Sequence, residues 1–337
     1  MRVCVLTTSY PRYEGDVAGA FVAELVDHVR ASGVEVTVVS PADVNHFGIA
    51  YGGGIVQNLR AKPWLVLVLP LFLLSFARAA RRGAAQADVV HAHWLPTALA
   101  ALATGKPFVL QLWGSDVALA RRIRVGVGPL LRRAECVIGA SEYLAAQARE
   151  LGARDVAVVP VGLELPSSVG PSADPPHVLY LGRLSPEKGI LEFLTASEGL
   201  ERVIVGDGPL RAQVVEATGF ISPDEVGRYL ERASVVCVPS RREGYGMTAR
   251  EAMAYGRPVV ASAVGGLADA VSDGVTGLLV TPGRPDELRS ALVRLLRDPP
   301  FAAQLGANAR EVARRDYSWP VATAALLDVY ARVARRR

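Results

Sequence analysis

Two cations and two carboxylates stand in loops of the second half of the chain, and each loop follows an apolar run typical of a strand. Arg183 and Lys188 lie five residues apart in the loop formed by residues 182–189. Cations held in place in this way stabilise the negative charge that a departing diphosphate gains, without a metal ion. Taken alone, the loop is explained equally well as a solvated turn in which Lys188 pairs with Glu187.

The two carboxylates belong to residues 243–251, a run in which a helix is expected to begin after Gly246. Glu243 and Glu251 are eight residues apart, which would be about 12 Å along a helix. Retaining glycosidases hold their two carboxylates about 5–5.5 Å apart, so this pair is better suited to opposite ends of one extended ligand. Glutamates of a first helical turn, favoured by the helix dipole, are the alternative interpretation.

Glycines mark two further loops after expected strands, Gly206-Asp207-Gly208 and Gly265-Gly266. Small residues let a nucleobase, a ribose or another ligand approach the backbone, although plain turns account for the glycines as well. The fingerprints of common nucleotide sites are missing, because no third glycine completes G-x-G-x-x-G and Gly105-Lys106 lacks the rest of a P-loop. Dehydrogenase and P-loop ATPase functions therefore lose most of their support.

These loops are expected at the carboxyl ends of parallel strands, where open α/β sheets bind ligands. Short β-rich runs alternate with helical patterns along the whole chain, which predicts parallel sheets covered by helices. An amphipathic helix is expected over residues 19–31. Strands are expected over residues 2–8, 34–40, 87–93, 108–114, 135–141, 156–162, 177–183, 202–208, 234–240, 258–264 and 277–282.

The length of 337 residues favours two domains. The segment 166–177 is rich in Pro, Ser and Gly and is the expected linker. We therefore expect an N-terminal Rossmann-like domain over residues 1–165 and a C-terminal one over residues 166–316. A final helical segment is expected over residues 317–337.

Composition excludes several classes of protein. Half of the residues are apolar, which excludes general disorder, and a net charge of +4 is too small an excess for a nucleic-acid-binding protein. Cys4, Cys136 and Cys237 lie in apolar, strand-like runs, which is typical of buried, reduced thiols. The first apolar run, residues 3–6, is too short for a signal peptide, so a cytoplasmic protein is expected.

Two basic runs without acidic residues lie in the first half. One, residues 60–82, surrounds an apolar stretch over residues 64–77 that is too short to span a membrane. The other contains Arg121, Arg122, Arg124, Arg132 and Arg133. Such runs favour peripheral contact with an anionic membrane or a phosphorylated acceptor, and solvated helix faces remain the alternative.

In their order and spacing these motifs resemble the retaining glycosyltransferases of family four, with the closest likeness between residues 178 and 282. That resemblance implies the GT-B fold, two Rossmann-like domains facing across a cleft with a C-terminal helix crossing back to the N-terminal domain. It implies a hexosyltransferase that moves a sugar from a UDP- or GDP-sugar to a hydroxyl acceptor, with retention and without a metal ion or other cofactor. It also implies cell-surface polysaccharide or glycolipid synthesis, in which the acceptor is a sugar or is lipid-linked. The apolar stretch 64–77 and its arginines suit such an acceptor at the inner membrane face.

The resemblance assigns three catalytic residues. It implies that Arg183 and Lys188 hold the diphosphate and that Glu243 meets the transferred sugar. It implies that Glu251 holds the ribose. The other donor contacts that it implies are Gly15, Gly182, Gly206, Gly208, Gly244, Tyr245, Gly246, Met247 and Thr248.

The first half resembles the family less closely. His93, Trp113 and Asp116 are expected on the acceptor side, and a metal role for His91 with His93 lacks an evident third ligand. Trp113 stands where the family commonly has a histidine, so no role of that histidine is carried to it. The family's Pro-Asn-Gly-Val-Asp appears here as residues 160–164, PVGLE. Because the motif is altered, it does not fix the position of the predicted boundary between the domains.

Two other functions remain open on these residues. A nucleotide-sugar epimerase or hydrolase of GT-B architecture would use the same donor contacts, and product analysis with and without acceptor separates it from a transferase. A nonenzymatic nucleotide-sugar-binding protein would leave its ligand unchanged on long incubation.

Overall fold

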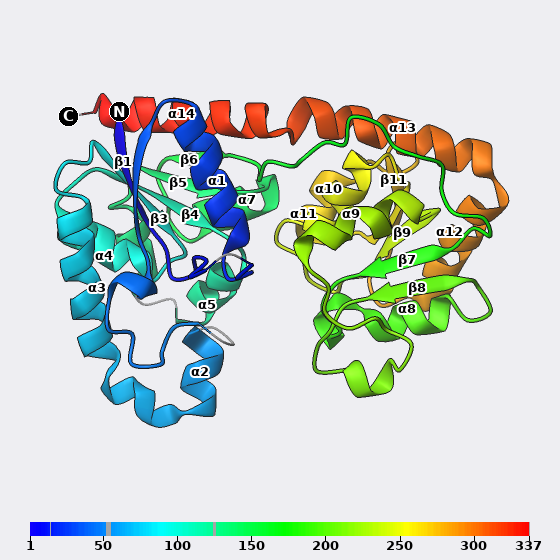
Figure 1. The fold of residues 1–337 in the computed structure, drawn as a ribbon, viewed down its shortest axis with the longest axis horizontal. Coiled ribbons are helices and arrows are strands. Elements are labelled where there is room, and N and C mark those ends of the chain that lie inside the picture. The colour runs from blue at the N-terminus through cyan, green and yellow to red at the C-terminus, as the bar shows by residue number, and fades with distance from the viewer. Residues whose placement is uncertain (14, 52–54, 124–125, 337) are drawn as a thin grey trace. The chain divides into compact units, whose positions relative to one another are not determined.

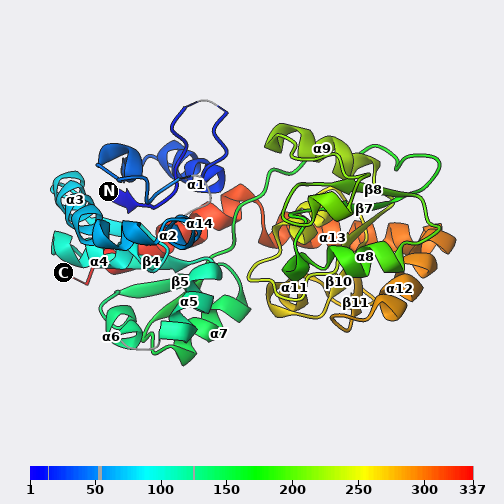
Figure 2. The ribbon, with the colours of Figure 1, turned by 90° about the horizontal axis from the view of Figure 1, so that it is seen from below.

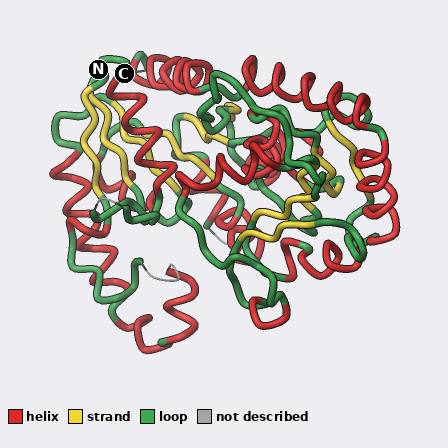
Figure 3. The backbone as a smooth tube through the Cα atoms, turned by 45° about the vertical axis from the view of Figure 1, so that its right-hand side comes forward, coloured by secondary structure: helices red, strands yellow, loops and turns green. Residues whose placement is uncertain are grey.

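The computed structural model describes residues 1–13, 15–51, 55–123 and 126–336. The chain divides into two compact units. Unit 1 contains Met1–Val161 and Ala322–Arg337, and unit 2 contains Gly162–Val321. Strands and helices alternate along both units (Figure 3), which confirms the predicted α/β class.

Unit 1 is built on a parallel sheet of six strands in the order β2-β1-β3-β4-β5-β6. The central strands are buried on both faces, which explains why apolar residues predominate in their sequences. The strands are β1 (Arg2–Leu6), β2 (Glu35–Val39), β3 (Val89–His93), β4 (Phe108–Leu112), β5 (Cys136–Gly139) and β6 (Val156–Val158).

Helices cover this sheet (Figure 1). The hydroxyl of Tyr330 lies 2.6 Å from His91 Nδ1 on β3, so the last helix packs against the sheet. In Figure 2, α3 and α4 lie side by side. The helices are α1 (Ala20–Ala31), α2 (Ile55–Ala61), α3 (Leu69–Gly83), α4 (Thr97–Thr104), α5 (Ser115–Ile123), α6 (Val127–Leu131), α7 (Glu142–Glu150) and α14 (Trp319–Ala334), which belongs to unit 1 from Ala322 onward.

The apolar stretch 64–77 is divided between two elements. A 3-10 turn spans Pro63–Leu67, and α3 begins at Leu69 with Pro70 in its first turn, where a missing N–H costs no hydrogen bond. Phe72 and Phe76 of α3 are buried, whereas its opposite side is exposed. No helix among the described residues is long and apolar enough to cross a membrane.

Unit 2 has a parallel sheet of five strands in the order β11-β10-β9-β7-β8. Val178 and Tyr180 pack towards α8 and α12, and the alternate residue Leu179 packs towards α9, α10 and α13. The elements are β7 (Val178–Leu181), α8 (Ile190–Ala196), β8 (Arg202–Val205), α9 (Pro223–Arg232), β9 (Val235–Val238), α10 (Met247–Ala254), β10 (Val259–Ser262), α11 (Gly265–Ala270), β11 (Gly277–Val280), α12 (Pro285–Arg297) and α13 (Pro299–Asp316).

The segment expected to be the linker has no regular structure but is anchored on unit 2. Arg257 donates to the carbonyl oxygen of Gly170 at 2.6 Å, and Arg310 donates to that of Pro166 at 2.6 Å. The division between the units falls earlier, after Val161. A Cβ atom on the next residue, Gly162, would lie 2.1 Å from the ring of Trp319, so only glycine fits against that indole.

All three cysteines are buried and free, as their sequence settings predict. Each lies on a strand, in β1, β5 and β9. All the predicted strands and the predicted helix over residues 19–31 are present, with ends that coincide or differ by up to four residues.

Candidate functional site

The carboxyl ends of β7 and β9 define the site in unit 2. The chain enters the sheet at β7, continues to β8 on one side and then to β9 on the other. In open α/β sheets the crevice outside the carboxyl ends of the strands at such a reversal is where ligands bind. The loops that follow β7 and β9 carry Lys188 and Glu243 respectively.

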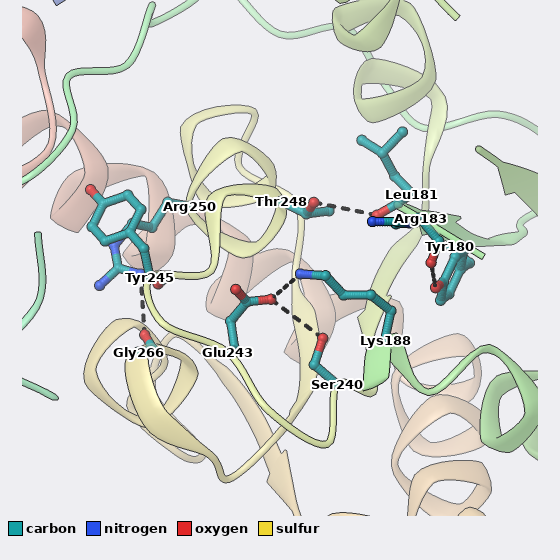
Figure 4. Close-up of polar contacts among 10 residues, drawn as sticks. All are labelled: Tyr180, Leu181, Arg183, Lys188, Ser240, Glu243, Tyr245, Thr248, Arg250 and Gly266. Atoms are coloured by element: carbon teal, nitrogen blue, oxygen red, sulfur yellow. Dashed lines mark hydrogen bonds and ion pairs between the residues drawn. The ribbon is translucent and has the colours of Figure 1, made fainter. Parts of the chain in front are cut away.

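Lys188 and Glu243 form an ion pair. Lys188 Nζ donates to Glu243 Oε2 at 2.6 Å, and Ser240 Oγ lies 3.4 Å from the same oxygen (Figure 4). The two side chains are 34% and 15% exposed, so both are partly shielded and remain open to a ligand. A bound anion would therefore meet an ammonium group that is already positioned.

The β7 loop is held in place by contacts with its neighbours. The Tyr180 hydroxyl donates to the carbonyl oxygen of Arg183 at 3.0 Å. Gly189 has a left-handed φ of 70°, and a Cβ atom there would lie 2.0 Å from Pro239 O in the β9 loop. Arg183 itself is exposed, beside the partly buried Gly182.

The glycines after β8 pack against the β7 loop. A Cβ atom on Gly206 would lie 1.9 Å from Gly182 O, and one on Gly208 would lie 2.5 Å from Leu184 O. The N–H of Leu184 donates to Asp207 O at 2.9 Å. Close approach within the chain itself therefore requires these glycines, whether or not a nucleotide approaches them.

Residues 243–251 form a loop and the start of α10. Gly246 takes a left-handed φ of 85° immediately before the helix, and Tyr245 is buried behind it. Thr248 Oγ1 donates to Leu181 O at 3.3 Å, which ties α10 to the end of β7 (Figure 4). Met247 and Glu251 are partly buried on the same helix.

The loop 243–246 also packs against α11. The N–H of Gly266 donates to Glu243 O at 3.0 Å, and a Cβ atom on Gly266 would lie 2.3 Å from Gly244 O. The predicted small-residue loop is therefore needed where the chain approaches itself. Gly266 fixes the position of the backbone that carries Glu243.

Sequence reasoning missed Arg250. This residue is 2% exposed, and its guanidinium carbon lies 3.9 Å from the ring centre of Tyr245 and 4.8 Å from that of Tyr317. It donates to the carbonyl oxygens of Tyr245 and Gly266, the latter at 3.1 Å. An arginine beside the alanines of a buried helix face was the available signal, because such a charge requires partners.

In unit 1 the predicted acceptor-side residues differ in exposure. His93 is fully buried, and Asp116 is 4% exposed, so both support the edge of the sheet without presenting a polar atom to solvent. Trp113 is half-buried. Gly15 is exposed in a left-handed conformation with a φ of 85°, and a Cβ atom there would have no neighbour within 4 Å.

The polar groups of His91 and His93 lie inside unit 1. Burial lowers the pKa of His91 to about 3 and that of His93 well below its ordinary value, so both rings are neutral. No group of three or more His, Cys, Asp or Glu side chains within the described part of the chain is arranged to hold a metal ion.

Comparison with known proteins agrees with this geometry. Residues 18–165 match the family described as Glycosyltransferase Family 4, and residues 164–312 match Glycosyl transferases group 1. A D-inositol 3-phosphate glycosyltransferase of Nocardioides is 31% identical, over 94% of this chain and 86% of that protein. The chain belongs to glycosyltransferase family four.

Solved structures show the fold of this family-four chain to be GT-B. Sucrose-phosphate synthase of Thermosynechococcus elongatus has a TM-score of 0.82 at 22% identity, and each chain is covered completely. HepE of Anabaena, solved in complex with UDP-glucose, has a TM-score of 0.73 at 19% identity, with 98% of this chain and 99% of HepE covered. Two Rossmann-like domains are therefore confirmed.

Proposed function

We propose that this glycosyltransferase moves a hexose from a UDP- or GDP-sugar to a hydroxyl group of a sugar or lipid-linked acceptor, with retention of the anomeric configuration. The observation that carries the proposal is the Lys188–Glu243 pair at the strand reversal of the unit 2 sheet. This place suits an anionic ligand that also bears hydroxyl groups, because a cation and a carboxylate lie side by side there. Cell-surface polysaccharide or glycolipid synthesis is the proposed setting.

The proposed reaction is a front-face substitution at the anomeric carbon. The bond from that carbon to the phosphate oxygen breaks, the acceptor oxygen bonds on the same face, and the acceptor proton passes to the departing phosphate. Lys188 and Arg183 would stabilise the charge of the departing diphosphate, with no metal ion in this role. Glu243 would contact the sugar, Glu251 the ribose, and the amides of residues 244–247 the sugar or phosphate.

A thermal-shift panel of UDP-, GDP- and ADP-sugars tests the donor. Binding to the native chain at a hundred times Kd stabilises it by about 2.7 kcal/mol, so the midpoint should rise. We expect UDP-sugars to give the largest shift, since the similar fold of HepE holds UDP-glucose. The variant Glu251→Gln should reduce that shift. Equal shifts from sugar 1-phosphates without a nucleoside would contradict the proposal.

A surface of unit 1 fits the proposed inner membrane face. Its apolar side chains, which we call the α3 patch, are exposed by 58% at Trp64, 81% at Leu67 and 53% at Leu71. Residues 44–87 contain no Asp or Glu, and the exposed cations around the patch include Lys62 and Arg78. Apolar side chains flanked by cations are suited to an anionic lipid surface.

Among the residues that the structure describes, the second basic run, unlike the first, includes a cation that is paired with a carboxylate. Arg121 is paired with Glu150 at 2.5 Å, and Arg124 lies outside the described residues. We therefore propose the α3 patch alone as the membrane contact.

Vesicle flotation tests the α3 patch. The chain should float with phosphatidylglycerol-containing vesicles, less so at high salt and less with pure phosphatidylcholine, because salt screens the lysine and arginine charges. The double variant Leu67→Ser with Leu71→Ser should lose flotation. Leu191→Ser is the matched control, since Leu191 is 41% exposed in unit 2. Equal loss in the control, or no loss in the double variant, would refute the proposal.

A further inference from the structure

Three aromatic side chains gather at the strand reversal of the unit 1 sheet. β1 lies between β2 and β3, so the reversal is at β1 and β3. Phe21 on α1 follows β1, Trp94 follows β3 and Trp113 follows β4. The Phe21 ring centre lies 5.9 Å from that of Trp94 and 4.7 Å from that of Trp113, and the two indoles are 6.2 Å apart. The ligand crevice of an open α/β sheet is expected at such a place.

Trp94 adopts a backbone conformation that a bulky residue rarely takes. Its φ is +66°, in the left-handed region. The conformation is fixed on both sides, because its N–H donates to Gln111 O at 3.0 Å and its carbonyl oxygen accepts from Thr97 N at 3.1 Å. Residues held in strained backbone conformations cluster at ligand sites, where the orientation of the side chain is needed for function.

Asp116 holds the two indole-bearing loops together. One carboxylate oxygen accepts from the backbone N–H groups of Trp113, Gly114 and Val117, each at 3.0 Å. The other accepts from Leu95 N, next to Trp94, at 3.2 Å. The carboxylate is therefore occupied by amides and acts as a positioning group for both indoles.

Polar atoms at this edge also require a partner. Among the described residues, none accepts from the buried Nε1–H of Trp113 or bonds to either ring nitrogen of His93. The His93 and Trp113 rings are stacked, with an interplanar angle of 11° and centres 5.8 Å apart. Buried indole N–H groups and imidazoles usually have hydrogen-bond partners. These buried atoms are therefore expected to hydrogen-bond to an ordered water.

We propose that Trp94 and Trp113 form the stacking surface for a pyranose ring of the acceptor. A pyranose has an apolar face of C–H groups, which packs on an aromatic face. The indole at position 113 thus sets the acceptor class. The identification of this pyranose as the acceptor rests on the proposed function. Binding of a pyranose to the two indoles does not depend on the donor.

Saturation-transfer NMR on the full chain tests the surface with methyl α-D-glucopyranoside, galactopyranoside and mannopyranoside. At least one should receive saturation on its C–H face, and D-glucitol, which has the hydroxyls without the ring, should receive much less. Trp94→Gly removes an indole and accepts the left-handed φ, so it should fold and weaken pyranoside binding roughly three- to tenfold. Trp113→Leu should do the same, and Trp113→Phe should retain binding.

UDP binding, measured on the same NMR samples, separates this inference from the donor proposal. It should be unchanged in every variant, because these residues belong to unit 1. The inference fails if no pyranoside binds to the wild type, or if Trp94→Gly binds pyranosides as well as the wild type. It also fails if uridine competes for the indoles, or if the variants lose UDP and pyranosides together.

Discussion

Replacing Lys188 by alanine is expected to lower kcat by about 10²-fold or more, the scale on which loss of one oxyanion-stabilising group acts. Two effects add. The diphosphate loses an ammonium group, and Glu243, 2.6 Å from that group, becomes an uncompensated negative charge beside the ligand. Steady-state turnover with the UDP-sugar chosen from the thermal-shift panel measures the loss.

Three variants control this result. Lys188→Met keeps most of the side-chain length and should lose as much turnover as alanine, which isolates the charge. Arg202→Met removes another partly buried cation, paired with Glu216 at 2.8 Å at the amino end of β8, and should leave kcat unchanged. In the double variant Lys188→Met with Glu243→Gln, the two losses should not add, because the residues are in contact. Near-wild-type turnover of Lys188→Ala would rule out the proposed charge stabilisation.

The sheets could be predicted because buried parallel strands have distinctive sequences. VVCV in β9 is buried at every position and is apolar throughout. VVHAH in β3 is also buried at every position, with two histidines among its apolar residues. The order of the strands within a sheet cannot be predicted in the same way. Nothing local in the sequence says that β9 lies beside β7, and β8, which comes between them in the chain, lies on the other side.

That order explains what the sequence left out of the site. Lys188 and Glu243 are 55 residues apart, and the resemblance gave each its own part of the donor. Their direct contact arises only when β7 and β9 pair. Arg250 was missed for a related reason, because its partners Tyr245, Gly266 and Tyr317 converge through α10, α11 and the segment before α14.

Burial was the other quantity that the sequence did not supply. Asp116 follows a Gly-Ser pair at the start of α5, a setting typical of an exposed helix cap, yet its carboxylate is buried among four amides. The sequence around Gly206 and Gly266 favours room for a ligand at the backbone. The structure shows that the room is filled by Gly182 and Gly244 of the chain itself.

The variant Gly266→Ala is expected to remove most of the turnover through the backbone alone. The added Cβ atom would lie 2.3 Å from Gly244 O and 2.7 Å from Tyr245 Cα, so the loop that carries Glu243 must move away from α11. Overpacking of this kind costs about 1–3 kcal/mol in stability. A misplacement of about 1 Å at a reacting group costs about 10²-fold in rate. Denaturant unfolding and kcat, measured on the same preparation, report the two effects separately.

Gly274→Ala is the matched control for that prediction. Gly274 also lies in unit 2 and has a left-handed φ of 70°, but a Cβ atom there would meet nothing within 4 Å. Its cost should be the conformational penalty alone, about 1–2 kcal/mol, with kcat unchanged. Equal stability losses with a loss of turnover only in Gly266→Ala would assign the rate effect to the Glu243 loop. Unchanged turnover in Gly266→Ala would mean that α11 moves to accommodate the added Cβ atom. The contact between α11 and the loop that carries Glu243 would then not be required for transfer.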